Sequence, residues 1–309
     1  MAPSLFHNLL PQIQAGSFKA LARCISLVEN QVEGYEAFMR ELPASTVQII
    51  GLTGPPGAGK STLADGLVGE LIAAGMKVGI ICVDPSSPFN LGALLGDRIR
   101  MSSWYNHPSV FIRSLATRGS VGGLHPNIIE ITDIMKVAGF DLVIVETVGV
   151  GQSEIEIAGL ADTTVVILVP EAGDEIQTMK AGLMEIADVF VVNKADRPDA
   201  DDFMRNLRMM LVPGMRNEQH VVPVLKTIAS QKVGIKELAD TIKISLQTVI
   251  SSDKKYLLLA ERAFYLIQKR RMKGVSKAAI KGEIIHLSEG KTFNMYQYVE
   301  SFPAGKVVI

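Results

Sequence analysis

The sequence predicts an α/β fold, a mostly parallel sheet flanked by N-terminal and C-terminal helical extensions. In its central region, short β-branched runs alternate with longer helical stretches, as in repeated βαβ units. The runs are continuously apolar, which is typical of strands buried on both faces of a parallel sheet. Before and after this region the periodicity is helical. We therefore expect an N-terminal extension over residues 1–46, an α/β domain over residues 47–250 and a C-terminal helical arm over residues 251–309.

The N-terminal extension is predicted to contain one helix. Ser17 is its expected N-cap, because a serine hydroxyl can accept a hydrogen bond from a free backbone N–H of the first turn. Pro43 is its expected end. The buried face is formed by apolar residues spaced four, three and four apart: Leu21, Ile25, Val28 and Val32.

Six strands are expected in the α/β domain, each a short apolar run followed by polar or turn residues. They span residues 47–52, 78–83, 142–146, 164–169, 189–193 and 221–225. Helices are expected between them, for example over residues 60–73 and 234–249. This alternation is the pattern of a parallel sheet with crossover helices.

The C-terminal arm is helical and basic. A run of charges of this kind is typical of a solvated helix face. The alternative is an oligomerisation arm or a docking surface, because five apolar residues form a stripe that could pack on a second subunit. The stripe consists of Tyr256, Leu259, Ala263, Phe264 and Ile267.

Composition excludes several classes of protein. The 309 residues include 31 lysines and arginines and 32 aspartates and glutamates, so the net charge is −1. Nucleic-acid-binding proteins need a basic surface, and this composition therefore argues against that class. There are two cysteines, Cys24 and Cys82, too few for a disulfide scaffold and in keeping with a reducing cytosol. Neither a secretory signal nor a membrane-spanning apolar stretch is present. We expect a cytoplasmic protein with no nucleic-acid or membrane partner.

The strongest motif lies between the first expected strand and the helix that follows it. It matches the phosphate-binding loop G-x-x-x-x-G-K-[ST], in which backbone N–H groups and a helix N-terminus surround phosphate oxygens. Lys60 is expected to reach the β- and γ-phosphates, and the Ser61 hydroxyl to ligate Mg²⁺. These features predict a P-loop NTPase domain. The loop consists of Gly54, Pro55, Pro56, Gly57, Ala58, Gly59, Lys60, Ser61 and Thr62.

A second motif predicts guanine as the base. Asn193, Lys194 and Asp196 form N-K-x-D directly after a predicted strand. The Asp196 carboxylate can accept hydrogen bonds from guanine N1–H and from the 2-amino group, and adenine has no donor at either place. The alternative is a helix N-cap aspartate before Pro198. The expected ligands are GTP and GDP.

Acidic residues end two further strands. Glu146 begins Glu-Thr-Val-Gly149, similar to a D-x-x-G element, so Glu146 could hold Mg²⁺ through water and the Gly149 N–H could face the γ-phosphate. Asp84 could orient the attacking water or a magnesium-bound water, or could simply form a turn with Pro85. Lys60, Asp84 and Glu146 are therefore expected to take part in catalysis, and Asp84 and Glu146 also in metal binding.

Two polar segments contain further candidate functional residues. Asp97 could reach the metal and act in catalysis, and Arg98 could reach a phosphate; an ordinary surface ion pair is the alternative. Residues 171–180 follow the fourth expected strand and could form a loop that reports the nucleotide state to a partner. They could equally begin a helix capped by Asp174.

These motifs together resemble those of the MeaB/ArgK-type GTPases. The resemblance covers residues 15–246 and is most specific in the string from Glu146 to Glu154. It implies a GTP-hydrolysing chaperone for an adenosylcobalamin-dependent acyl-CoA mutase, typically methylmalonyl-CoA mutase, active in cofactor loading and protection. It also implies a homodimer joined through helical extensions. Where the family has Ser-Ala, this chain has Thr227-Ile228-Ala229, so the Ala229 N–H is expected to contact guanine alone.

Three other functions stay open at this stage. One is a P-loop kinase acting on a protein or a small molecule. Another is a nickel or cobalt metallochaperone GTPase, which the scattered histidines and the absence of Cys-x-x-Cys disfavour. The third is a nucleotide-gated scaffold without enzymatic activity.

Overall fold

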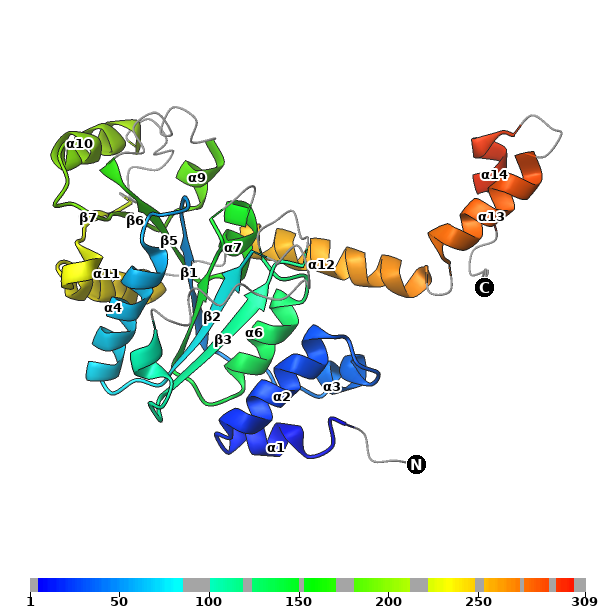
Figure 1. Cartoon of the computed structure of the whole chain (residues 1–309), viewed down its shortest axis with the longest axis horizontal. Coiled ribbons are helices and arrows are strands. Elements are labelled where there is room, and N and C mark those ends of the chain that lie inside the picture. The colour runs from blue at the N-terminus through cyan, green and yellow to red at the C-terminus, as the bar shows by residue number, and fades with distance from the viewer. Residues whose placement is uncertain are drawn as a thin grey trace. The chain divides into compact units, whose positions relative to one another are not determined.

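The computed structural model describes residues 5–85, 101–118, 124–149, 153–170, 181–211, 222–247, 253–272, 275–288 and 293–302. The chain forms two compact units that divide between Ser252 and Asp253 (Figure 1). Asp97, Arg98 and residues 171–180 lie outside the described residues.

The first unit is built on a seven-stranded sheet in the order β3-β2-β4-β1-β5-β6-β7. Every pair of neighbouring strands is parallel, which confirms the predicted α/β class. β1 lies between β4 and β5, near the middle of the sheet, so its carboxyl end is flanked by strands on both sides. The strands are β1 Gln48–Thr53, β2 Val78–Asp84, β3 Val110–Ala116, β4 Leu142–Glu146, β5 Thr163–Leu168, β6 Val189–Val192 and β7 Val224–Lys226.

Each of the six expected strands overlaps an observed one, but β3 was not predicted. It lies at the edge of the sheet and pairs only with β2 in the described structure. Its apolar run is interrupted by Arg113 and Ser114. The continuous apolar pattern of a central strand is therefore missing, and only the pairing with β2 makes the segment a strand.

The N-terminal region forms three helices rather than one, namely α1 Leu9–Gln14, α2 Phe18–Glu29 and α3 Tyr35–Arg40. The Ser17 hydroxyl accepts a hydrogen bond from the Ala20 N–H at 3.3 Å, which confirms the N-cap. The expected end at Pro43 is wrong, because α2 already ends at Glu29. Gln31 and Gly34 have φ angles of 49° and 93°, which a continuing helix does not allow.

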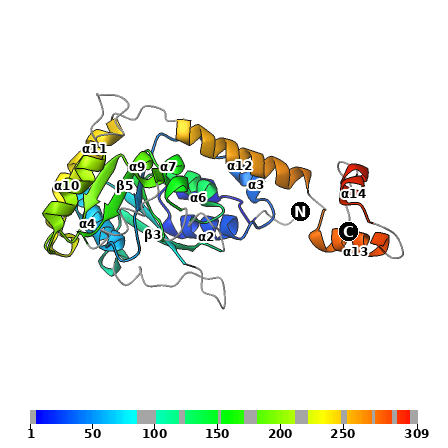
Figure 2. The same ribbon diagram turned by 90° about the horizontal axis from the view of Figure 1, so that it is seen from above.

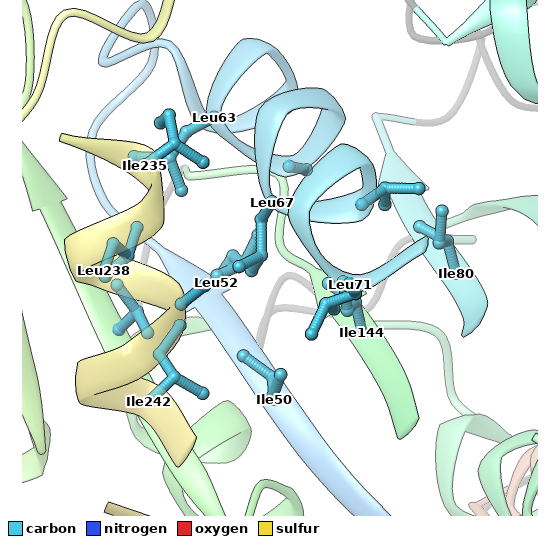
Figure 3. Close-up of a cluster of buried hydrophobic side chains, with 14 of the residues drawn as sticks. Ile50, Leu52, Leu63, Leu67, Leu71, Ile80, Ile144, Ile235, Leu238 and Ile242 are labelled. Carbon is cyan, nitrogen blue, oxygen red and sulfur yellow. The ribbon is translucent and has the colours of Figure 1, made fainter. Parts of the chain in front are cut away.

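Two helices cover one face of the sheet, α4 Lys60–Ala73 and α11 Ile235–Gln247. Figure 3 shows leucines of α4 and α11 meeting isoleucines of the strands in one fully buried cluster. The opposite face is covered over β5 and β6 by α9 Ala181–Ile186 and α10 Ala200–Leu211. Because α4 is packed on both α11 and the sheet, its first turn is held rigidly beside β1.

Further helices on the opposite face are α6 Ile128–Lys136 and α7 Ser153–Leu160. α7 packs on β1 and β5. α2 lies beside α6 in both views (Figures 1 and 2). It also contacts β3, because the ring centroids of Phe18 and Phe111 are 5.4 Å apart. A short 3-10 helix, η1 Ser102–Trp104, precedes β3, and a second, η4 Ala229–Gln231, follows β7.

A repeated aspartate organises the amino edge of the sheet. Three strands are each preceded by an aspartate whose carboxylate accepts a backbone N–H from the start of a neighbouring strand, or from the residue just before it, at 2.7–2.8 Å. The N–H of each aspartate donates in turn to the same residue. This reciprocal pair satisfies backbone groups that the ladder leaves open and fixes the register of adjacent strands. The pairs are Asp141 with Lys77, Asp162 with Ile49, and Asp188 with Thr164.

The second unit contains α12 Asp253–Arg271, α13 Lys277–Ser288 and α14 Met295–Ser301. The Tyr298 hydroxyl of α14 donates to Glu283 of α13 at 2.8 Å, so these two helices lie side by side. Neither helix contains a buried residue. On α12, Tyr256 and Phe264 are 61% and 68% exposed. No described helix of the chain has the length and apolar character needed to cross a membrane.

Candidate nucleotide-binding site

The phosphate-binding loop connects β1 to α4, and its glycines are required by geometry. Gly54, Gly57 and Gly59 have φ angles of 142°, 76° and 87°. A Cβ atom on Gly54 would lie 2.0 Å from the Ile167 carbonyl oxygen, and one on Gly59 would lie 2.4 Å from Asn193 Nδ2. Any side chain at either position would collide with β5 or with the residue that follows β6. The loop can therefore close only with glycine.

Lys60 is the first residue of α4 and is only 7% exposed. Its ammonium donates to the carbonyl oxygens of Gly54 and Pro55 at 3.0 Å and 3.1 Å. These two contacts hold the ammonium folded across the loop, at the positive end of the helix. Phosphate oxygens are stronger acceptors for an ammonium group than neutral carbonyl oxygens are.

Ser61 and Glu146 meet beside the loop, although 85 positions separate them in the sequence. The Ser61 hydroxyl donates to Glu146 Oε1 at 2.7 Å, and both residues are buried. Glu146 ends β4 and lies opposite Leu52 of β1 in the sheet register. The structure thus brings two of the predicted metal-binding residues into direct contact.

Asp84 completes the carboxyl edge on the other side of β4. It is the last residue of β2 and is 5% exposed. β2 and β4 are neighbours, with Cys82 opposite Glu146. Asp84 and Glu146 therefore end adjacent strands on the edge that faces the phosphate-binding loop.

The residues at this edge fit magnesium. A hydroxyl and carboxylates are hard oxygen donors, and Mg²⁺ is commonly bound by one or two protein ligands together with nucleotide phosphates. The described residues contain no group of three or more histidine, cysteine, aspartate or glutamate side chains that could hold a metal by themselves. A set of one hydroxyl and two carboxylates is the kind of site at which Mg²⁺ binds together with nucleotide phosphates.

The segment after β4 lies directly against the phosphate-binding loop. Gly149 has a φ angle of 83°, and a Cβ atom there would come within 2.3 Å of Lys60 Nζ and 2.4 Å of the Gly54 carbonyl oxygen. Thr53 is the last residue of β1, and Thr147 directly follows β4. The buried hydroxyl groups of these two residues are 3.0 Å apart. The sequence did not single out this threonine pair, because Thr53 precedes the phosphate-binding loop and Thr147 occupies a variable position of the element that begins at Glu146. The hydrogen bond between the two threonine hydroxyl groups joins the carboxyl ends of β1 and β4.

Asn193 connects the phosphate-binding loop with the loop expected to bind the base. It is 2% exposed, and its Nδ2 donates to the Ala58 carbonyl oxygen at 2.8 Å. Its Oδ1 accepts hydrogen bonds from the Thr227 hydroxyl at 3.0 Å and from the Ala229 N–H at 3.1 Å. Lys194, the next residue, has a φ angle of 56°, and Asp196 is exposed. The turn thus leaves the Asp196 carboxylate accessible.

Ala229 has a hydrogen-bond partner within the protein. Its N–H donates to Asn193 Oδ1 at 3.1 Å, and its expected contact with guanine stays a prediction. A buried carboxamide oxygen needs donors, and Thr227 and Ala229, which follow β7, supply them. The sequence pattern assigned no role to Thr227, which is fully buried.

Comparison with known proteins agrees with this site. A model of the family described as "Methylmalonyl Co-A mutase-associated GTPase MeaB" matches residues 21–282. The chain belongs to the MeaB family. The match includes the phosphate-binding loop, the acidic strand ends and the N-K-x-D motif, so the predicted resemblance is confirmed.

Several relatives of this MeaB family chain are named as GTPases. A protein of Pyrococcus abyssi is 48% identical over 244 residues, which cover 77% of this chain and 75% of that protein. GTPase ArgK of Escherichia coli is 39% identical over 191 residues, 60% of this chain and 58% of ArgK. The crystal structure of a LAO/AO transport system kinase, 24% identical, has the same fold, with a TM-score of 0.65 and 97% of each chain covered.

One relative is named as a fused mutase. The fused isobutyryl-CoA mutase of Geobacillus kaustophilus is 36% identical over 287 residues. The match covers 83% of this chain and 26% of that protein. A region similar to this MeaB family chain is therefore part of a longer polypeptide named as a mutase.

Proposed function

We propose that this MeaB family protein is a magnesium-dependent GTPase that converts GTP and water into GDP and phosphate. The observation that carries the proposal is the position of Asn193, which hydrogen-bonds to the phosphate-binding loop on one side and to the base loop on the other. The two loops are thereby held as halves of one nucleotide site. Family membership and relatives named as GTPases support the same activity.

The residues of the site divide the work as follows. Backbone N–H groups of the phosphate-binding loop bind the phosphates, and Lys60 exchanges its two carbonyl acceptors for β- and γ-phosphate oxygens. Ser61, Asp84 and Glu146 would hold Mg²⁺, together with Asp97. The metal, when bound, would neutralise the charge that develops on the phosphates. Asp84 would also orient the attacking water, and the Gly149 N–H would face the γ-phosphate.

The test is phosphate release from excess GTP in the presence of Mg²⁺. Wild-type protein should release many equivalents of phosphate, and Lys60→Ala should lower the rate to background because the γ-phosphate loses its buried cation. Lys19→Ala, which removes an exposed lysine on α2, is the matched control and should retain wild-type activity. Transfer of labelled γ-phosphate to another acceptor would favour a kinase, and a single turnover would favour a scaffold.

We further propose that the partner is an adenosylcobalamin-dependent acyl-CoA mutase, with methylmalonyl-CoA mutase as the first candidate. The family description names that mutase, and the Geobacillus relative carries a mutase in the same polypeptide. In this role the GTPase controls cofactor loading and protects the mutase. Addition of the mutase should raise the rate of GTP hydrolysis; an unchanged rate with both methylmalonyl-CoA and isobutyryl-CoA mutases would contradict the proposal.

The C-terminal arm supports a homodimer in this proposal. Large apolar side chains on α12 are exposed within the second unit, among them Phe264 at 68% and Ile267 at 55%. Surfaces of this kind mark interaction sites in soluble proteins. A cytoplasmic location agrees with Cys24 and Cys82, which are both buried and form no disulfide.

A further inference from the structure

Glu29 is a junction between the N-terminal helices and the edge of the sheet. It is the last residue of α2, and its side chain is 13% exposed. Its carboxylate accepts a hydrogen bond from Arg113 of β3 at 2.7 Å and another from Arg118 at 2.9 Å. Two guanidinium groups thus converge on one nearly buried carboxylate, which gives charge-assisted hydrogen bonds.

Arg118 is held tightly in a conformation that arginine rarely adopts. Its φ angle is 48°, in the left-handed region. Its guanidinium donates to the Glu29 carboxylate, to the Glu29 carbonyl oxygen at 3.1 Å and to Asn30 Oδ1 at 3.0 Å. Such backbone strain persists only where surrounding contacts impose it, and it is concentrated at functional sites. The end of α2 supplies the contacts that impose it here.

Arg118 is linked to Asp84 through the residue that precedes it in the chain. The residue before it, Thr117, donates its backbone N–H to the Asp84 carbonyl oxygen at 3.1 Å. Ala116 is the partner of Asp84 in the register of β2 and β3. The backbone of Asp84 is therefore fixed on one side by a segment whose conformation depends on Arg118.

We propose that Glu29 is a positioning residue of the GTPase site. It fixes Arg118, and through Thr117 it sets the place of the Asp84 carboxylate at the carboxyl edge of the sheet. The N-terminal helices thereby act as a brace for the magnesium side of the site, not as a separate module. The inference rests on the proposed function, because it assigns Asp84 to that reaction.

The test compares Glu29→Gln with the matched control Glu33→Gln. Both remove one negative charge, but Glu33 is exposed and lies outside the clamp. Glu29→Gln keeps the shape of the side chain and loses the charge that binds both arginines. Since small displacements of catalytic groups cost up to about 100-fold in rate, we expect kcat to fall about 10-fold and KM for GTP to stay within about twofold.

Two measurements separate positioning from general damage to the fold. The Mg²⁺ concentration for half-maximal activity should rise in Glu29→Gln, whereas GDP binding without Mg²⁺ should keep the wild-type affinity and stoichiometry. A loss of stability alone would lower the amount of GDP bound. If Glu29→Gln does not fold, Arg118→Lys, which keeps the charge but loses the fork that joins Glu29 to Asn30, should give the same pattern.

The outcomes are distinct. Wild-type activity in a folded Glu29→Gln protein, or an equal change in Glu33→Gln, would overturn the positioning role and leave the proposed function intact. Failure of the wild-type chain to hydrolyse GTP would overturn the proposed function, and the inference with it.

Discussion

Asn193 shows how much of the nucleotide site depends on single buried polar atoms. Both ends of its carboxamide are satisfied, by Ala58 on one side and by Thr227 and Ala229 on the other. Because a buried polar group without a partner costs about 1–3 kcal/mol, the two loops are energetically coupled through this side chain. Asp196, three residues later, is exposed and can take its partners from a ligand.

We expect Asp196→Asn to change the base that the protein prefers. The asparagine oxygen can still accept from N1–H, which guanine and xanthine share. Its amide N–H, however, faces the guanine 2-amino group, which is also a donor, whereas xanthine has a carbonyl oxygen at that place. Preference for GTP over xanthosine triphosphate should fall by at least about 100-fold in competition binding. Asp202→Asn, at an exposed position on α10, is the control. Unchanged base preference would refute the role of Asp196.

Cys24 should be chemically inert in the folded protein. Burial raises the pKa of its thiol from 9.0 to about 12, because the thiolate cannot be solvated inside α2. At pH 8 we expect no alkylation by iodoacetamide, which attacks thiolates. Denatured protein should be alkylated at both cysteines. Rapid modification of the native protein, measured by mass spectrometry, would show that α2 opens.

The same pKa shift has a consequence for stability. Between pH 9 and about 12 the folded chain retains a proton on Cys24 that the unfolded chain releases. The free energy of unfolding should therefore decrease as the pH rises through this window.

At the scale of elements, the sheet determines where the chemistry lies. Parallel strands end at one edge, so Glu146, Asp84 and the phosphate-binding loop meet there although they are distant in sequence. The opposite edge has its own regular feature, the reciprocal aspartates that precede β4, β5 and β6. Sequence patterns predicted the buried strands well because their apolar runs are continuous. They missed β3 because an edge strand can carry an arginine and a serine in its middle.

The strand-start aspartates are expected to contribute to stability. Asp162→Ala leaves the Ile49 N–H without its acceptor at the start of β1, and this should lower the free energy of unfolding by about 1–3 kcal/mol. Urea denaturation measures the change. Asp240→Ala, at an exposed position on α11, should change stability by less than about 0.5 kcal/mol. Equal effects of the two substitutions would show that the reciprocal pair is not stabilising.

At the scale of the whole molecule, the chain divides into a well-packed unit and a poorly covered one. Residues up to Ser252 enclose the sheet and its clusters, whereas α13 and α14 bury no residue. Helices with exposed aromatic and aliphatic side chains are only marginally stable in water, because most helix stability comes from packing of the apolar face. The proposed dimer provides a reason for this arrangement.

We expect the C-terminal unit to determine the oligomeric state. A fragment of residues 1–252 should be monomeric by light scattering and should still bind GDP, because the site lies wholly in the first unit. In the full chain, Phe264→Asp should weaken the dimer by placing a charge on an apolar surface. A full-length protein that is monomeric at micromolar concentration would instead favour a solvated helix face.

The sequence by itself determined the α/β class, the phosphate-binding loop, the guanine motif and the family, because each depends on residues close together in the chain. Only the tertiary structure decided which distant groups meet. It joined Ser61 to Glu146, joined the Ala229 N–H to Asn193, and placed Glu29 on Arg118, whose neighbour Thr117 bonds to Asp84. The physical reason is that local patterns fix backbone conformation, whereas hydrogen bonds across strands and layers depend on how those elements pack.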